Sequence, residues 1–424
     1  MNVSCKALDG LNMTFKKKIF LIFAMCFFSF YFALSDFYKT IPYLILFIAI
    51  FYKLYSGIKL DIKIILFCFF VIVSPIFGDL INIFYRDVTP LSSIEKVIRN
   101  IVLILPIAVI LKLEDDYSFH AFLILLGVLF VTMVASILQY NGFYAVENTY
   151  IYGNRIGLWW NPIPFSNAVV FILAVFSGVF MVLISHESTY KKNLQICFFL
   201  GFISAGVVIS LSGTRGSLIG YLFIFMCVYN FLLMQFFQNR VHRVFGLLLM
   251  FFIIILSLYF VRDGFALAYS EFLRHFLIGS EPSSISIRLT MWDFSIFAFK
   301  EHVFLGLGID KILPLKESLI EKGYYPDYLI LYHTHSDILD SMLRSGLIGL
   351  IGIVLLYMSP LVASKYFGCR IRQFLPLSIL TCVAFIMGVF DTPLRNNVSV
   401  NSFYICYFII LYVCLKNLNK AKVV

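Results

Sequence analysis

Residues 218–236 read LIGYLFIFMCVYNFLLMQF, a run of nineteen residues without a charged side chain. About 20 apolar residues in an α-helix cross the roughly 30 Å hydrocarbon core of a bilayer, so this run predicts a membrane-spanning helix. Comparable runs recur from Ile19 to Leu415, and no polar interval between them is large enough for a separate domain. Of the 424 residues, 61% are hydrophobic and 13% are charged, with a mean hydropathy of +0.94. Because soluble domains carry about 25% charged residues, the composition indicates an integral membrane protein.

Twelve such runs predict an all-α, polytopic fold. They are Ile19–Leu34, Ile41–Tyr55, Ile64–Gly78, Val97–Leu111, Phe119–Leu138, Pro164–Ile184, Leu194–Leu211, Leu218–Phe236, Val244–Val261, Leu343–Leu361, Phe374–Phe390 and Phe403–Leu415. A transmembrane barrel is excluded, because barrel strands alternate apolar and polar residues over about ten positions.

The distribution of Lys and Arg predicts the orientation. With the N-terminus inside the cell, the short cytoplasmic segments hold eighteen Lys and Arg, and the short outer segments hold seven. Cytoplasmic loops carry the excess of positive charge in membrane proteins, so both termini are expected in the cytoplasm. The basic helix ends also account for the net charge of +10 without any nucleic acid partner. The signal-like start FKKKIFLIFAMCFFSFYFAL is expected to remain as the first helix, since further spans follow at once.

The longest connection between predicted spans is Arg262–Asp340, which this orientation places outside the cytoplasm. Three parts are therefore expected: residues 1–261 with nine spans, a large loop over residues 262–340, and residues 341–424 with three spans and a short cytoplasmic tail. Connections this long are uncommon without a function. Within the loop, FALAYSEFLRHFLIG and SISIRLTMWDFSIFAFKEH predict short amphipathic helices.

The sequence predicts neither a cofactor nor a bound metal. It contains no GxxxxGK[ST] phosphate loop, no Cys/His metal spacing and no Asp-x-Asp pair in the outer segments. The acidic run Glu114-Asp115-Asp116 falls on the cytoplasmic side. None of the nine cysteines lies in an outer segment, so they are expected to be small buried side chains rather than a disulfide framework.

Arg215 lies in SGTRGS, which turns the chain tightly between two predicted spans. The neighbouring Gly213 and Gly216 allow backbone and ligand to approach closely. Exposed amides at the start of a helix bind phosphate, so the turn predicts a phosphate-binding arginine. The alternative is an arginine that only extends its side chain to the membrane surface.

Arg288 follows SSIS, a plausible helix start with Ser283 or Ser284 as the N-cap residue. Taken alone, it reads as a solvated charge on an amphipathic loop helix. The guanidinium is nevertheless the group best suited to bidentate contact with phosphate, because it is planar and always charged.

His335 lies in THSD, where Thr334 and Asp337 have the spacing of a capping box. This places His335 in the first turn of the helix that runs into the tenth span, at the outer membrane surface. A histidine with a pKa of about 6.5 suits a general base or a positioning group near neutral pH. The alternative is a structural imidazole, and the neighbouring His333 is a rival that is expected to point elsewhere.

Further candidates surround these three residues. Ser336, Tyr332 and Trp292 are candidate substrate-binding residues, although Tyr and Trp also anchor proteins at membrane interfaces. Asp391, Arg395 and Arg344 lie on or near the outer face and could assist, and the sequence does not rank them. Ser345, Gly346, Gly349 and Gly352 give the tenth span a small-residue face that favours close helix packing.

Arg215, Arg288 and His335 all fall at one face of the predicted topology. Two arginines suit a diphosphate leaving group, and an imidazole suits a hydroxyl nucleophile. The combination indicates extracytoplasmic glycosyl transfer from a lipid-linked diphosphate sugar.

The chain resembles the O-antigen ligase family of Gram-negative inner membranes, which shares a superfamily with O-antigen polymerases and protein O-oligosaccharyltransferases. The match is His335-Ser336, nine residues, Gly346, two residues and Gly349, a spacing that selects His335 over His333. The TRG at Thr214–Gly216 resembles the outer arginine motif, with Ile219 where a leucine is usual. The segment ISIRLTMWDFSIFAFKEHVFLGLGID resembles the loop region before the histidine motif.

The resemblance implies a glycosyltransferase C-like fold with a periplasmic loop and a periplasmic active site. It implies an inverting, metal-independent transfer of O-antigen polysaccharide from undecaprenyl diphosphate to a sugar hydroxyl of the lipid A–core oligosaccharide. His335 would then activate or orient the acceptor hydroxyl, while Arg215 and Arg288 hold the diphosphate.

Two other functions remain as alternatives. An O-antigen polymerase would use the same donor with another O-antigen chain as acceptor. A transporter or flippase also has twelve spans, but transporters place ionisable residues at mid-membrane, and these predicted spans are nearly free of charge.

Overall fold

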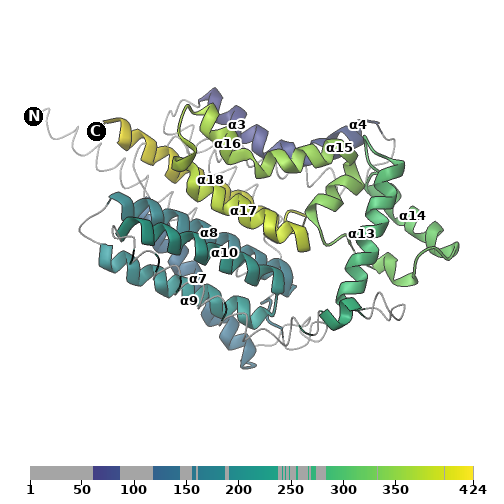
Figure 1. Cartoon of the computed structure of the whole chain (residues 1–424), viewed down its shortest axis with the longest axis horizontal. Helices are drawn as coiled ribbons and strands as arrows, with labels where there is room; N and C mark the ends of the chain where they lie inside the picture. The colour runs from purple at the N-terminus through teal and green to yellow at the C-terminus, as the bar shows by residue number, and fades with distance from the viewer. Residues whose placement is uncertain are drawn as a thin grey trace, which may run out of the picture.

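The computed structural model describes residues 61–85, 118–143, 155–158, 161–186, 191–236, 283–331, 333–395 and 397–423, together with isolated positions between 241 and 273. These parts of the chain are helical and contain no β-strand. Two groups of long helices lie one above the other, and a set of shorter helices stands at one end of both (Figure 1). The all-α prediction is therefore confirmed for the described residues.

Eight helices in the described residues are long and apolar enough to cross a membrane, and each matches one predicted span. Their ranges are Ile62–Asn82, Ser118–Tyr140, Pro162–Ser185, Lys191–Ser212, Arg215–Gln235, Asp337–Tyr357, Ile371–Phe390 and Ser399–Leu418. The other four predicted spans (Ile19–Leu34, Ile41–Tyr55, Val97–Leu111 and Val244–Val261) lie outside the described residues, apart from isolated positions in the last. The chain is thus a multi-pass helical membrane protein.

Helix α8 (Pro162–His186) is the centre of the lower group, because 94% of its membrane-spanning window is buried. It is enclosed by α7 (Ser118–Tyr140), α9 (Lys191–Ser212), α10 (Arg215–Phe236), α17 (Leu375–Phe390) and α18 (Asn397–Val423). A helix that is apolar on all sides has no face suited to water, which explains its place inside the bundle.

Aromatic rings join α7, α8 and α9. Phe122 stacks on Phe176 with ring centroids 4.6 Å apart, and Phe180 stacks on Phe198 at 4.3 Å. All four side chains are buried. Offset aromatic pairs contribute about 0.5–1.5 kcal/mol beyond the area that they bury, so this stack helps to fix the three helices side by side.

The upper group contains α3 (Ile62–Val73), the short turn η2 (Ser74–Ile76), α4 (Phe77–Tyr85), α15 (Asp337–Tyr357) and α16 (Ser359–Tyr366). The predicted small-residue face of α15 packs here: a Cβ added at Gly352 would collide with the carbonyl of Ser74, and one added at Gly78 with Ser345. Small residues let the two backbones approach this closely. The turn η5 (Ile371–Phe374) leads into α17.

The predicted loop carries α13 (Ser284–Glu301), α14 (Ile309–Glu321) and η4 (Asp327–Leu331) at the end of the bundle where α15 begins (Figure 1). These elements share a core of their own with the start of α15. Its buried members are Ile287, Met291, Phe294, Ala298, Leu307, Leu319, Leu329 and Leu343. The helix predicted over SISIRLTMWDFSIFAFKEH is therefore present as α13, and the one predicted over FALAYSEFLRHFLIG falls largely outside the described residues.

Helix α15 is broken at Gly346, whose φ of 61° and ψ of −145° are not helical. This corrects the prediction that Gly346 only provides a small packing face. At the break, Leu347 N–H donates to Val303 O (2.7 Å), and Leu307 N–H donates to Leu343 O (2.7 Å). A Cβ on Gly346 would lie 2.5 Å from Gly306 N, and Gly306 also has a positive φ of 66°. The segment after α13 is thus bound to α15 through main-chain atoms, with glycine required on both sides.

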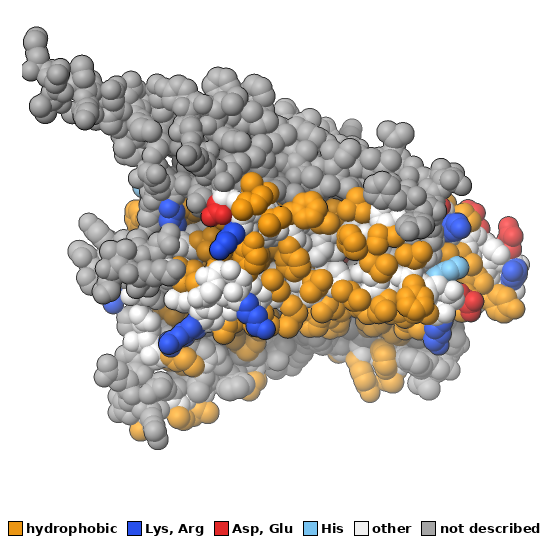
Figure 2. Space-filling view, turned by 90° about the horizontal axis from the view of Figure 1, so that it is seen from above, with side chains coloured by type: hydrophobic (Ala, Val, Ile, Leu, Met, Phe, Trp, Pro, Cys, Tyr) orange, Lys and Arg blue, Asp and Glu red, His pale blue; other side chains and the backbone are white. Residues whose placement is uncertain are grey.

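The surface agrees with a membrane environment. Figure 2 shows a broad field of hydrophobic side chains across one face, with charged side chains gathered toward its two ends. Exposed apolar residues on α15 include Ile351, Val354 and Leu355. An exposed apolar field of this kind fits lipid rather than water. The seven described cysteines are free thiols, and Cys5 and Cys26 lie outside the described residues.

Candidate active site

The turn between α9 and α10 holds Arg215 as the first residue of α10, with an exposed side chain. Gly213 has a φ of 63°, as a tight turn requires. Arg155 packs against this turn: its Nε donates to Ser212 O at 2.9 Å, and its side chain lies beside Gly213. A second arginine, one of the seven Lys and Arg in the short outer segments, is therefore fixed next to Arg215.

Arg288 lies on the second turn of α13. Ser283 is the N-cap residue, and it forms a reciprocal capping box with Ser286, so the predicted helix start is confirmed. The Nε of Arg288 and the Nε1 of Trp292 are buried and have no acceptor among the described residues. Because positions i and i+4 share one helix face, both donors would be satisfied by one ligand that offers acceptor oxygens.

Arg155, Arg215 and Arg288 lie close enough to act on one another electrostatically. Burial lowers the pKa of Arg155, and the positive charges of Arg215 and Arg288 lower it further. Burial also lowers the pKa of Arg288; the Asp391 carboxylate opposes this effect, and the Arg215 charge adds to it. Like charges held together in a partly buried place favour an anionic ligand. We call these three residues the arginine cluster.

His335 precedes α15 rather than lying in its first turn, which corrects the sequence prediction. Helix α15 begins at Asp337 with Ser336 at the N-cap position, and His335 has a left-handed φ of 49°. The predicted capping box does not form: Thr334 Oγ1 instead donates to Asp340 Oδ1 (3.2 Å). The reason is local competition, since a buried carboxylate of the same helix lies within reach of the hydroxyl.

A carboxylate from a distant segment faces His335. Asp391, the residue after α17, has its Oδ1 3.8 Å from His335 Nδ1, and both side chains are 13% exposed. Burial would raise the pKa of Asp391, but hydrogen bonds and the nearby His335 imidazole outweigh it and hold that pKa below its ordinary value. Asp391 is therefore an anion that can orient and stabilise the imidazole.

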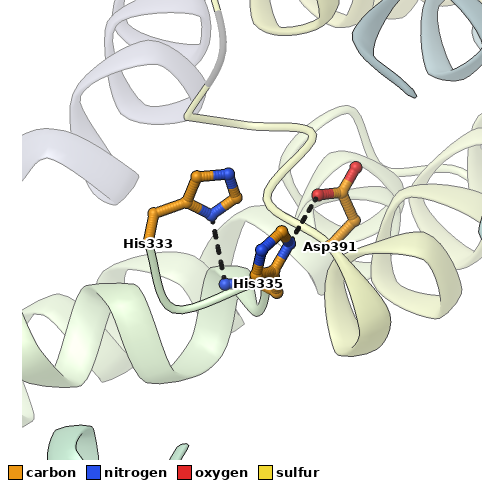
Figure 3. Close-up of side chains that lie close together, drawn as sticks. All are labelled: His333, His335 and Asp391. Carbon is orange, nitrogen blue, oxygen red and sulfur yellow. Dashed lines mark hydrogen bonds and ion pairs between the residues drawn. The ribbon is translucent and has the colours of Figure 1, made fainter. Parts of the chain in front are cut away.

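His333 points toward His335, contrary to the prediction that it points elsewhere. The ring centroids are 4.0 Å apart, and His335 N–H donates to His333 Nδ1 (3.2 Å). Figure 3 shows the two imidazoles side by side on the loop before α15, with Asp391 opposite. The ring keeps an exposed edge, yet desolvation and the charges of His335 and Arg395 lower the pKa of His333 to about 4.

A continuous chain of hydrogen bonds joins the arginine turn to Asp391. Thr214 Oγ1 donates to Ser166 Oγ (2.6 Å), which lies 2.8 Å from Ser217 Oγ. Ser217 donates to Asn167 Oδ1 (2.8 Å), and Asn167 Nδ2 donates to Asp391 Oδ2 (2.7 Å). These five residues, which we call the polar chain, connect the neighbours of Arg215 to the partner of His335. The structure therefore brings the arginine cluster and His335 to the same end of the bundle.

Arg344 and Arg395 have other partners. Arg344 pairs with Asp79 (2.9 Å) and Asp340 (3.3 Å), and Arg395 pairs with Asp340 (2.6 Å). This ionic network of Asp79, Asp340, Arg344 and Arg395 is part of α4, α15 and the turn after α17, next to a cavity of 60 Å³. The prediction that the spans are nearly free of charge is corrected here, since three of its members lie within candidate spans. The network is neutral as a whole, which makes its burial tolerable.

The remaining predicted residues differ in what the structure says of them. Ser336 is buried, and its carbonyl accepts from Asp340 N–H (2.8 Å). Tyr332 lies outside the described residues. Sequence reasoning missed Arg155 and Asn167, because their importance depends on contacts with segments 57 and 224 residues away. Asp391, by contrast, was already a candidate from the sequence, because it is an acidic residue at the outer end of a predicted span.

The site also contains a set of metal-ligand side chains. One ligand atom each from His333, His335 and Asp391 lies within 4.8 Å of the other two. Imidazole nitrogen and carboxylate oxygen suit Zn²⁺ and related ions. The sequence did not predict this group, because its members come from two separate segments.

The fold and the site together define a polytopic membrane protein with an arginine cluster joined by hydrogen bonds to an imidazole–carboxylate pair. Over residues 200–354, the chain matches the family model described as O-antigen ligase, so the resemblance found in the sequence is confirmed. The match includes Arg215, Arg288 and His335. Members of this family are glycosyltransferase-like enzymes of lipopolysaccharide synthesis. A comparison with curated proteins found no match.

Proposed function

We propose that this chain is an O-antigen ligase, which transfers O-antigen polysaccharide from undecaprenyl diphosphate to a sugar hydroxyl of lipid A–core oligosaccharide. The observation that carries the proposal is the connection of the arginine cluster, through the polar chain, to Asp391 and His335. A cationic group suited to a diphosphate thus lies beside a group suited to a hydroxyl nucleophile. The family match at residues 200–354 supports the same chemistry.

The arginine cluster would bind the donor diphosphate. Arg215 and Arg288 are the ligands expected from the sequence, and we add Arg155 because it is fixed beside Arg215 by its bond to Ser212 O. As the bond between the anomeric carbon and the diphosphate breaks, negative charge grows on the leaving oxygen. Fixed guanidinium groups stabilise that charge more than the ground state, and one such donor is typically worth about 2.7–4 kcal/mol in the barrier.

His335 would act on the acceptor. Its imidazole receives the proton of the attacking sugar hydroxyl, or orients that hydroxyl, while Asp391 stabilises the imidazolium that forms. The hydroxyl oxygen forms the new glycosidic bond as the diphosphate oxygen leaves, and attack from the opposite face inverts the anomeric centre. The lipid diphosphate departs with the electron pair, and the proton remains on His335.

The site would face the periplasm of a Gram-negative inner membrane, with both termini in the cytoplasm. The distribution of Lys and Arg supports this orientation. Trp292 and Ser336, and Tyr332 outside the described residues, remain proposed substrate contacts. Trp292 has the most support, because its buried indole N–H lies one turn from Arg288 on α13.

A gel of lipopolysaccharide from a deletion strain tests the reaction. Loss of a ligase leaves complete O-antigen on the lipid carrier and the core bare, and complementation with the chain restores the ladder. Single repeats on the core would instead identify a polymerase. O-antigen retained on the cytoplasmic face would support a flippase, and an unchanged ladder would contradict all three.

A further inference from the structure

Three metal-ligand side chains meet at the histidine end of the site. His333 and His335 come from the loop before α15, and Asp391 comes from the end of α17 (Figure 3). Two imidazoles, one carboxylate and an open fourth position are a common donor set for a single zinc ion. The arginine cluster is positively charged and suits an anion, whereas these three side chains offer lone pairs that can bind a cation.

The geometry is nearly that of a metal site. Zinc bonds to nitrogen and oxygen of about 2.0–2.2 Å place ligand atoms roughly 3.3 Å apart in a tetrahedron. His335 Nδ1 and Asp391 Oδ1 are already 3.8 Å apart, and all three ligand atoms lie within 4.8 Å. His333 is exposed, and its Nδ1 accepts from His335 N–H (3.2 Å) and lies 3.5 Å from Thr392 Oγ1, so its side chain would have to rotate to complete the set.

The surroundings hold two of the ligands ready. Asn167 donates to Asp391 Oδ2, which leaves Oδ1 directed at His335. Outer hydrogen bonds of this kind orient metal-binding carboxylates. The charges of Arg288 and Arg395 nearby oppose a dication, so the affinity is expected to be below that of closed structural zinc sites.

We propose that His333, His335 and Asp391 form an inhibitory site for Zn²⁺. With the ion on Nδ1 of His335, the imidazole proton is held on Nε2, so the ring can no longer receive the proton of the acceptor hydroxyl. This inference rests on the proposed function of His335, but the binding of the ion does not. Metal binding is reversible, so transfer stops while the ion is bound and resumes when it leaves. Mg²⁺ and Ca²⁺ are not inhibitors, because they prefer all-oxygen ligand sets.

The first experiment measures Zn²⁺ binding to the full-length protein in detergent, with the affinity tag removed and a chromogenic chelator as competitor. One ion per chain is expected. His333→Gln and Asp391→Asn should each weaken binding by about tenfold or more, because each removes one of three ligands. His302→Gln, an exposed histidine at the end of α13, is the matched control and should bind like the wild type. Equal affinity in the wild type and His333→Gln would overturn the site.

The second experiment measures ligation of a purified lipid-linked donor to lipid A–core at increasing Zn²⁺ concentrations. Half-maximal inhibition should fall near the measured dissociation constant, move to higher Zn²⁺ in His333→Gln, and disappear on addition of EDTA. Inhibition of wild type and His333→Gln at the same concentration would refute the inhibitory role. If His333→Gln has no activity, the binding experiment decides alone.

The two experiments separate the two proposals. A chain that binds Zn²⁺ through His333 but performs no ligation in metal-free buffer retains the metal site and loses the proposed function. A chain that ligates normally but shows no His333-dependent binding loses the metal site alone.

Discussion

The two halves of the site are held in place by different forces. The arginine turn belongs to a bundle around α8 whose interior is apolar away from the polar chain, with stacked rings such as Phe122–Phe176 and Phe180–Phe198. His335 belongs to a region held by charges and main-chain hydrogen bonds, namely the ionic network and the joint at Gly346. Apolar packing tolerates changes of shape that keep the volume, whereas buried charges tolerate little change in their partners.

This difference teaches how the site is assembled. The polar chain crosses from one region to the other, ending on Asp391. Each region supplies one chemical function, positive charge from the bundle and a proton acceptor from the charged region. Arg288 does not follow this division. It adds positive charge to the arginine cluster, but it belongs to α13, which packs on α15 in the charged region.

The largest expected effect comes from removing the proton acceptor of the charged region. His335→Ala should lower ligation by about 10²–10⁴-fold, the usual contribution of a general base, with unchanged membrane insertion. The rate of oligosaccharide transfer to lipid A–core in membranes measures this, with His302→Ala as the control. Ligation at the wild-type rate in an inserted His335→Ala protein would exclude the imidazole role.

Arg344→Met tests the ionic network. It leaves the carboxylates of Asp79 and Asp340 without their shared partner, which should cost about 3–5 kcal/mol of stability. Thermal unfolding of the detergent-solubilised protein measures the loss. Arg372→Met is an exposed control and should stay within about 0.5 kcal/mol of the wild type. If Arg344→Met and Arg372→Met unfold at the same temperature, the ionic network does not stabilise the charged region.

Arg155 tests whether the bundle supplies a third phosphate ligand. Arg155→Ala should raise the KM for the lipid-linked donor by about tenfold, equivalent to about 1.4 kcal/mol, while Arg155→Lys should retain part of the affinity. The KM for lipid A–core should be unchanged in both variants. A larger KM for the acceptor alone would move Arg155 out of the diphosphate site.

The smallest effect is expected in the apolar region. Phe180→Leu keeps most of the buried volume and should cost less than about 1.5 kcal/mol. Thermal unfolding is again the measurement, read beside that of Arg344→Met. A loss as large as that of Arg344→Met would erase the contrast between the two regions.

The sequence predicted the eight described spans well, because long apolar runs leave few alternatives in a membrane. It also predicted the start of α13 with Ser283 or Ser284 as the cap, a purely local signal, and the structure has Ser283. It failed at THSD, where the capping pattern is local but Asp340 captures Thr334. A four-residue pattern does not show that an acceptor six residues further on competes for the same hydroxyl.

The candidate site was predicted in part for the same reason. Arg215, Arg288 and His335 carry recognisable local contexts. Asp391 and Asn167 become important only when α17 and α8 lie side by side, and His333 becomes a neighbour of His335 only through the left-handed turn at His335. These facts depend on the folded chain.

The joint at Gly306 and Gly346 has a consequence for how such a protein can diverge. Its bonds run between amides and carbonyls, which every residue except proline supplies in full. The exposed side chains of this joint, Val303, Phe304 and Leu305, are therefore free to change without shifting Arg288 relative to His335, provided that the two glycines stay. Related proteins could therefore change the surface of this joint to suit a new saccharide while the spacing of Arg288 and His335 stays the same.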